Sequence, residues 1–260
     1  MAKLIPEPEQ SQRTATDWLK TPFGQALLAH EARVVEEAFD GKFGEQLLQL
    51  GLWGEPNAFT RFARTQRACC IADWPDRVPG AALGAFGQLH RLPIATESVD
   101  VVFLPHTLDY SDDRSHAILR EADRVLTPHG HLVVLGFKPG GLWGLRRLVP
   151  GAGLPPGAPH LMSDRRLSDW LLLLDMRIHS VTRYFFRWPL PGNKGQSSPE
   201  WENRGRRFWP ELAACYMLSA QKRVVTMTPV KQPWRARAKV VGSIVEPTTR
   251  VSRIRFDRNR

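Results

Sequence analysis

The chain has 260 residues, 42% of them hydrophobic and 24% charged, with a formal net charge of +10. This length suits one α/β domain with short appendages and is small for two full domains. The three cysteines provide neither a disulfide framework nor the spacing of metal ligands. The N-terminus has Pro, Glu and Gln where a signal peptide needs an apolar core, and no run approaches the ~18 apolar residues of a membrane span. We therefore expect a soluble cytoplasmic protein without a membrane span or a metal site.

The positive charge is concentrated at the C-terminus. Residues 222–260 contain 11 Lys and Arg against 2 Asp and Glu, so the rest of the chain is almost neutral. From Thr226 onward Pro, Thr and dispersed Arg replace any helical or strand periodicity. The sequence predicts a disordered basic tail over 226–260. A folded basic face for nucleic acid is not favoured.

The N-terminal segment, residues 1–43, is expected to contain one helix. Residues 1–15 are polar and predicted to be unstructured. Thr21 and Pro22 suit the N-cap and first position of a helix that ends before Gly41. Its apolar side would carry Leu27, Leu28, Val34, Val35 and Phe39.

The next segment alternates strands and helices. We predict a buried strand over Leu47–Leu50, a helix over Pro56–Arg64 and a strand over Ala68–Ala72. A third, weaker strand is expected within 81–89.

Residues 92–138 then read as one βαβ unit. Val99 and Val101–Leu104 form a β-branched apolar run typical of a parallel strand covered on both faces. Asp112 or Asp113 could cap a helix in which Ile118, Ala122, Val125 and Leu126 recur at helical spacing. The helix should end near Leu126, with a turn at 127–130 and a strand over Leu132–Phe137.

The remaining residues add a loop, a helix and two strands. The Gly/Pro-rich stretch 139–159, which contains Trp143, could form a lid. Ser163 and Asp164 can cap a helix that ends at Leu174. Strands are expected over Arg177–Arg187 and Ala213–Val225, separated by an irregular excursion over 189–210.

The segments LPI, SVDVVFLPHTLDY and LREADRVLTPHGHLVVLGFKP resemble the centre of class I S-adenosylmethionine-dependent methyltransferases of the small-molecule type 11 group. The match extends over about 44–225, and His129 replaces one Gly of the family's Arg-Val-Leu-x-Pro-Gly-Gly turn. The resemblance implies a doubly wound, mostly parallel Rossmann-like sheet that ends in an antiparallel hairpin. It also implies S-adenosylmethionine as cofactor.

The turn after the first strand is the first candidate part of the site. Gly51 and Gly54 would let the backbone approach a ligand closely, and a following helix would offer its N-terminus to the cofactor's carboxylate. An ordinary strand-to-helix turn explains the same pattern. The family usually has an acidic residue at the place of Gln49, and Trp53 stands where smaller residues are common. The indole could crowd the methionine site or pack beneath it.

Three further positions are implied to bind the cofactor. Asp73 stands where the family places a carboxylate on the ribose hydroxyls, although a turn-forming loop Asp is an equal alternative. Gln88 replaces the usual carboxylate that accepts from the adenine amino group, and Leu89 could pack on the adenine face.

The loop after the 99–104 strand carries His106, Asp109 and Tyr110 at the sheet edge where open α/β sheets bind ligands. His106 could orient the cofactor or the acceptor, or accept a proton, or make only a structural hydrogen bond. Asp109 and Tyr110 are weaker catalytic candidates.

The sequence thus predicts methyl transfer from S-adenosylmethionine to a small-molecule acceptor. Two alternatives remain: a methyltransferase-fold binding protein that has lost catalysis, suggested by Gln49, Gln88 and Trp53, and an RNA-binding methyltransferase that uses the tail. Aromatic residues at Trp143, 184–188, Trp201, Phe208 and Trp209 could roof the pocket, although core or loop packing is the commoner role.

Overall fold

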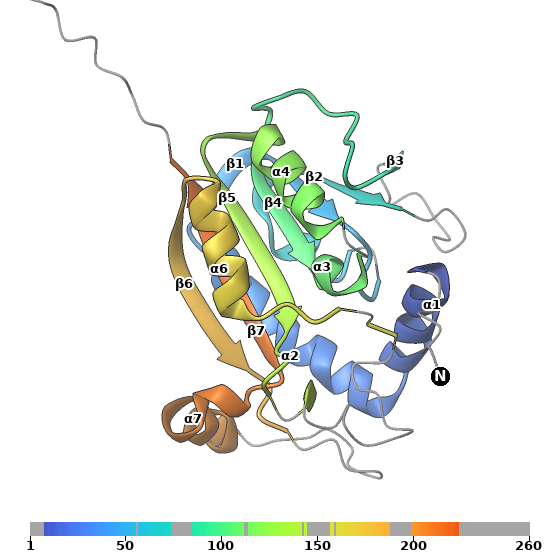
Figure 1. The fold of residues 1–260 in the computed structure, drawn as a ribbon, viewed down its shortest axis with the longest axis vertical. Coiled ribbons are helices and arrows are strands. Elements are labelled where there is room, and N and C mark those ends of the chain that lie inside the picture. Colours follow the sequence, from blue (N-terminus) through green and yellow to red (C-terminus); the bar gives the residue numbers. More distant parts are fainter. Residues whose placement is uncertain are drawn as a thin grey trace, which may run out of the picture. The chain divides into compact units, whose positions relative to one another are not determined.

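The computed structural model describes residues 8–55, 57–73, 85–111, 114–141, 143–144, 157–158, 160–187 and 199–223. These residues form a seven-stranded sheet with helices on both faces (Figure 1). The predicted tail and most of the 139–159 loop lie outside the described residues.

The strand order is β3-β2-β1-β4-β5-β7-β6. The strands are β1 (Phe43–Leu50), β2 (Arg64–Ala72), β3 (Ala85–Phe86), β4 (Val99–Pro105), β5 (Leu126–Phe137), β6 (Met176–Tyr184) and β7 (Cys215–Lys222). Strands β1 to β5 pair in parallel, and β7 runs antiparallel between β5 and β6. The doubly wound sheet and its antiparallel C-terminal pair are as predicted.

Alternation along the central strands sends side chains to two cores. Leu47, Val101 and Val133 pack on one face with Leu27 and Val35 of α2 (Pro22–Phe39). Their neighbours Leu48, Val102 and Val134 pack on the other face, with α4 (Ser115–Val125) and α6 (Asp164–Leu173). The remaining helices are α1 (Pro8–Leu19), α3 (Thr107–Tyr110) and α7 (Pro199–Phe208), with 3-10 turns at Thr60–Phe62 and Pro210–Leu212.

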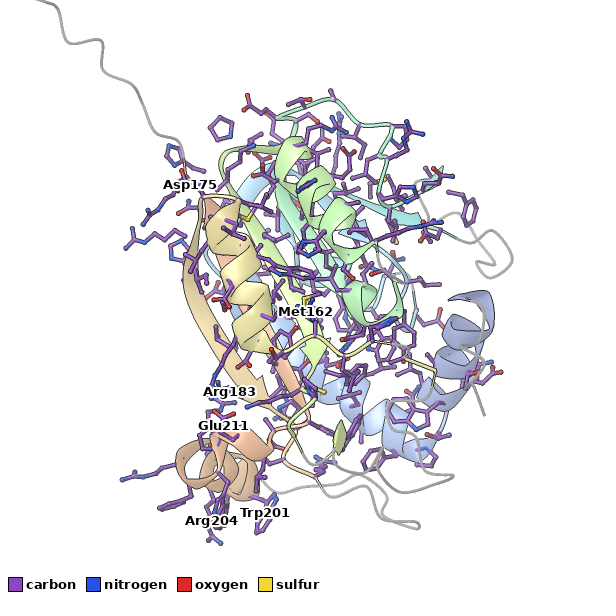
Figure 2. All side chains as sticks on the ribbon, viewed as in Figure 1. Met162, Asp175, Arg183, Trp201, Arg204 and Glu211 are labelled. Atoms are coloured by element: carbon purple, nitrogen blue, oxygen red, sulfur yellow. The ribbon has the colours of Figure 1, made fainter. Side chains whose placement is uncertain are left out.

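Both predicted N-caps are confirmed. The Thr21 hydroxyl accepts from the Gly24 N–H and the Ser163 hydroxyl accepts from the Arg166 N–H. At the far sheet edge, Arg183 of β6 bonds Asp164 Oδ2 at 2.7 Å and Glu211 Oε1 at 3.0 Å. Figure 2 labels Arg183 and Glu211 above α7. These ion pairs join β6 to α6 and to the 210–212 turn.

Several local predictions are wrong. Residues 8–19 form α1 although 1–15 were expected to be unstructured. Among the described residues, the helix expected over 56–64 is only the 3-10 turn Thr60–Phe62, and β2 begins at Arg64. Helix α4 has Arg114 at its N-cap without a side-chain bond, and the proposed caps Asp112 and Asp113 lie outside the described residues. Part of the expected irregular excursion is helix α7.

The predicted turn at 127–130 is also not a separate turn, because β5 runs through it. The pairing of β4 with β5 shifts register between Val99 and Val101. His129 has φ +65°, a left-handed conformation that suits Gly better than His. The residues expected to form a turn are therefore an irregular part of β5, with a register shift opposite β4 and a left-handed residue.

Candidate functional site

The predicted site residues follow the carboxyl ends of β1, β2 and β4. These strands are neighbours, and the chain reverses its direction of strand addition between β1 and β4. Such a switch point leaves a crevice at the carboxyl edge of an open α/β sheet. The fold therefore brings Gly51, Asp73 and His106 to one edge.

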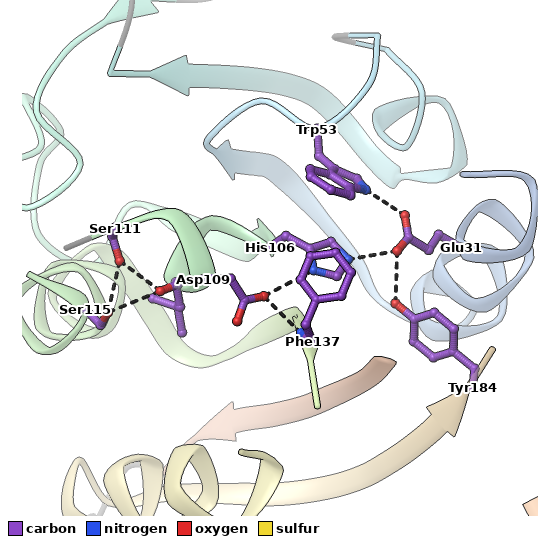
Figure 3. A network of polar contacts seen from close by, with 9 residues as sticks. Glu31, Trp53, His106, Asp109, Ser111, Ser115, Phe137 and Tyr184 are labelled. Atoms are coloured by element: carbon purple, nitrogen blue, oxygen red, sulfur yellow. Dashed lines mark hydrogen bonds and ion pairs between the residues drawn. The ribbon is translucent and has the colours of Figure 1, made fainter. Parts of the chain in front are cut away.

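His106 stands at the end of β4 in a left-handed conformation with φ +54° and is fully buried. Its Nε2 lies 2.8 Å from Glu31 Oε1 and its Nδ1 lies 3.2 Å from Asp109 Oδ2 (Figure 3). The Asp109 carboxylate also accepts from the Phe137 N–H at 2.9 Å. Both ring nitrogens thus have carboxylate partners.

Glu31 is the centre of this network, and the sequence analysis did not single it out. It lies on α2, is completely buried, and accepts from Trp53 Nε1 at 2.7 Å and from the Tyr184 hydroxyl at 3.3 Å. A carboxylate one turn after Leu27 on an apolar helix face is the signal that could have identified it. Its three partners, Trp53, His106 and Tyr184, come from three separate segments of the chain.

The two carboxylates keep the imidazole charged. Burial alone disfavours the imidazolium, but Glu31 and Asp109 outweigh burial and raise the pKa of His106 to about 9. Burial raises the pKa of Asp109 against the opposing effect of His106. We conclude that His106 holds a proton at neutral pH and forms a buried cation between two acidic groups.

Trp53 packs beneath the glycine turn and is 2% exposed. Its ring centroid lies 4.5 Å from that of His106, and the Phe137 ring lies 4.0 Å from the imidazole. The imidazolium therefore contacts two aromatic rings, which favours the charged form further. The indole is therefore part of the hydrophobic core next to the glycine turn.

The glycine turn has the expected backbone. Gly51 and Gly54 have φ +87° and +73°, and a Cβ on Gly51 would lie 2.7 Å from Thr107 Oγ1. Gln49 is buried: its Nε2 donates to the Gly51 carbonyl, and its Oε1 has no hydrogen-bond partner among the described residues. The α-helix expected directly after the turn is absent from the described residues, so the turn itself is not followed there by a helix N-terminus.

The other predicted residues differ in placement. Asp73 Oδ1 accepts from the Leu89 N–H at 2.9 Å, so this carboxylate joins the end of β2 to the loop after β3. Leu89 is buried and Gln88 is exposed. Tyr110 is 5% exposed, with its ring 5.8 Å from that of Trp53. The proposed roofing residue Trp143 is instead fully buried in the core beside Phe137.

A cavity of about 20 Å³ lies beside His106, bounded by α1, the glycine turn and α3. Its lining residues are Ala15, Thr16, Gly51, Leu52, Trp53, Pro105, His106, Thr107 and Tyr110. That space admits about one water molecule. The glycine backbone and the Gln49 oxygen, which has no partner among the described residues, fit the polar end of a cofactor, but a cavity of this size is far smaller than a cofactor.

Comparisons with known proteins bear on the fold and on one segment of the chain. The profile described as a methyltransferase domain matches residues 79–134. The S-adenosylmethionine-dependent methyltransferase of Mesorhizobium loti is 14% identical with a TM-score of 0.50, covering 73% of this chain and 96% of that one. The [4+2]-cyclase SpnF is 19% identical with a TM-score of 0.53, covering 75% and 80%. The structural likenesses establish the fold.

The chain belongs to the same family as the Escherichia coli protein YafS and has the fold of S-adenosylmethionine-dependent methyltransferases. The Escherichia coli (strain K12) protein YafS, named as uncharacterized, is 32% identical over 227 residues, which span 83% of this chain and 85% of YafS. No helix in the described part of the chain is long and apolar enough to cross a membrane. The described residues also contain no group of three or more His, Cys, Asp or Glu suited to a metal ion.

Proposed function

We propose that this chain binds S-adenosylmethionine at the carboxyl ends of β1, β2 and β4 and transfers its methyl group to a small-molecule acceptor. The observation that carries the proposal is the meeting of the positive-φ glycine turn, Asp73 and His106 at the switch point of the sheet. The methyltransferase domain profile supports the same reaction class.

The residues that would hold the cofactor lie at or near the carboxyl ends of the strands. Gly51 offers close backbone approach, and the Gln49 oxygen offers an acceptor in place of a carboxylate. Asp73 offers a carboxylate for a diol, and Leu89 offers an apolar surface. When bound, the cofactor supplies an already activated methyl group, so transfer requires chiefly alignment of the reactants in a dry pocket.

His106 acts in this proposal as a positioning residue. Its imidazolium holds the Glu31 carboxylate, and that carboxylate holds the Trp53 indole. Both ring nitrogens are engaged and the side chain is buried, so a general-base role would require this network to open first. Methyl transfer from a sulfonium needs no base when the acceptor atom already has an available lone pair and any proton it carries is lost to solvent.

Replacement of Trp53 tests whether the indole limits cofactor entry. Trp53→Ala removes the side chain that fills the turn, so we expect S-adenosylhomocysteine to bind at least roughly tenfold more tightly than to the parent protein. Isothermal titration calorimetry measures the change. Trp201→Ala, which removes a half-exposed tryptophan of α7, is the control and should leave the affinity unchanged. Equal affinities for Trp53→Ala and the parent would contradict the indole as a barrier.

A second candidate function is a methyltransferase-fold binding protein without catalysis. Trp53 inside the turn and the neutral side chains at Gln49 and Gln88 favour it. SpnF, which is named as a cyclase, shares the fold, so the fold alone does not fix the reaction.

The two candidates are separated by a transfer assay with S-adenosylmethionine labelled on its methyl group. The full chain is incubated with an extract, which is then divided into small molecules, protein and nucleic acid. Label in the small-molecule fraction supports the proposal. Cofactor binding without any transfer supports the binding protein, and label in RNA that is lost on deletion of residues 226–260 supports the tail-dependent alternative.

A further inference from the structure

The link from β1 to β2 leaves part of the N-terminal helices uncovered. Residues 51–63 carry only the 3-10 turn Thr60–Phe62, whereas the link from β4 to β5 carries both α3 and α4. A parallel crossover normally places a helix on the sheet face. Here α1 and α2 lie opposite a segment without an α-helix among its described residues.

A cavity of about 350 Å³ lies between α1, α2 and this link. That volume falls in the ~300–1,000 Å³ range of small-molecule pockets. Leu19, Leu28, Ala32 and Phe59 give it apolar walls from three segments of the chain. The side chains on α2 that line it lie on the opposite face from the buried Leu27 and Glu31. The cavity is therefore separate from the His106 network and shares with the smaller cavity only Thr16.

The charged residues at this cavity favour an anion. Lys20 lies at the end of α1 and Arg61 lies in the 3-10 turn, whereas Glu55 is the one acidic lining residue. Lys20 Nζ is 3.0 Å from Asp17 Oδ1, but both side chains are about two-thirds exposed, and such pairs contribute little. The Arg61 guanidinium lies 4.7 Å from the centre of the Phe62 ring. Both cations can thus reach a ligand head group at small cost.

We propose that this cavity binds an amphipathic monoanion, with an apolar chain or ring between α1, α2 and the 51–63 link and a carboxylate-like group at Lys20 and Arg61. The apolar walls supply most of the free energy of binding through burial of the ligand body. The two cations set the preference for one negative charge. The site includes Gly54 of the glycine turn, but its binding of the anion needs no cofactor.

The test uses dodecanoate and dodecyltrimethylammonium below their micellar concentrations and dodecanol below its solubility limit, in calorimetric titrations of the full chain without cofactor. We expect dodecanoate to bind one molecule per chain and to bind at least roughly tenfold more tightly than the cationic and neutral probes. Absence of dodecanoate binding, or equal binding of the cationic probe, would overturn the proposal.

Two variants locate the binding. Ala32→Phe places a ring in the cavity and should abolish binding, and the double variant Lys20→Glu, Arg61→Glu should weaken dodecanoate at least roughly tenfold. Arg67→Glu reverses an exposed charge on β2 outside the cavity and should bind like the parent protein. Circular dichroism melting verifies that each variant is folded. Unchanged binding by a folded Ala32→Phe would place the probe elsewhere and overturn the assignment.

Discussion

At the scale of single residues, Glu31 connects the N-terminal helix to the strand edge that bears the candidate site. Its two carboxylate oxygens accept from Trp53, His106 and Tyr184, and none of these side chains is more than 2% exposed. Removing one partner of a buried ion pair is strongly destabilising, and loss of the Glu31 charge would leave the buried His106 cation with Asp109 as its remaining acidic partner.

Glu31→Gln should therefore lower the free energy of unfolding by about 3–5 kcal/mol. The variant should also lower the pKa of His106, because Glu31 is the foremost of the groups that raise it. Urea denaturation measures the first effect and NMR titration of the imidazole the second. Glu36→Gln, an exposed position on the same helix, should change stability by no more than ~0.5 kcal/mol. Equal effects of the two variants would contradict the network.

The stability of the protein should fall on the alkaline side. The folded-state pKa of His106 is raised to about 9 from the ordinary 6.5, so the folded state binds a proton that the unfolded state releases. The contribution of His106 to the free energy of unfolding is complete below pH ~6.5 and is lost as the pH rises through about 9.

Denaturation curves at pH 6, 8 and 9.5 for the parent and for His106→Asn measure this dependence. Asn tolerates the left-handed backbone at this position, so the variant removes the titrating group without adding strain. The parent should lose stability over this range more steeply than the variant. Parallel curves would mean that His106 does not carry the bound proton.

At the scale of elements, β5 contains a strained position. His129 has φ +65° and is exposed, so its left-handed backbone lowers the free energy of unfolding relative to Gly at this position. His129→Gly should raise the free energy of unfolding by about 1 kcal/mol, measured by urea denaturation. His129→Ala keeps the strain and removes the imidazole, so it should not stabilise the protein. Stabilisation by Ala equal to that by Gly would attribute the effect to the side chain.

The elements that the sequence predicts well are those with a strong local pattern. The apolar runs of β4 and β5 and the capping residues Thr21 and Ser163 are local patterns, so these elements can be predicted from short-range information. Helix α1 was missed because its segment PEQSQRTATDWL has few apolar residues. The helix expected after β1 was overpredicted, since the link before β2 contains only the 3-10 turn Thr60–Phe62 among its described residues.

In the candidate site too, the features with a local sequence pattern were predictable and the long-range contacts were not. Gly51, Asp73 and His106 were placed correctly at the sheet edge because strand ends are predictable. The network could not be predicted, since Glu31 and His106 are 75 residues apart and Tyr184 lies 153 residues from Glu31. Such contacts depend on how α2 crosses the sheet, which no local pattern specifies.

At the scale of the whole molecule, the sheet order creates one edge at which a cofactor could meet backbone, carboxylate and buried cation. Three neighbouring strands end there, and α1 and α2 lie against the same region. The central claim is that this edge binds S-adenosylmethionine, with Asp73 as a charged partner for the ribose.

The most direct measurement is a calorimetric titration of the full chain with S-adenosylhomocysteine, compared with Asp73→Asn. Asn keeps an acceptor for the Leu89 N–H and removes the charge, so the variant should fold normally and bind roughly tenfold more weakly. Asp169→Asn, at an exposed position of α6, should match the parent. We predict saturable binding with one site and this order of affinities. Absence of binding at millimolar ligand, or equal affinity of parent and Asp73→Asn, would contradict the account.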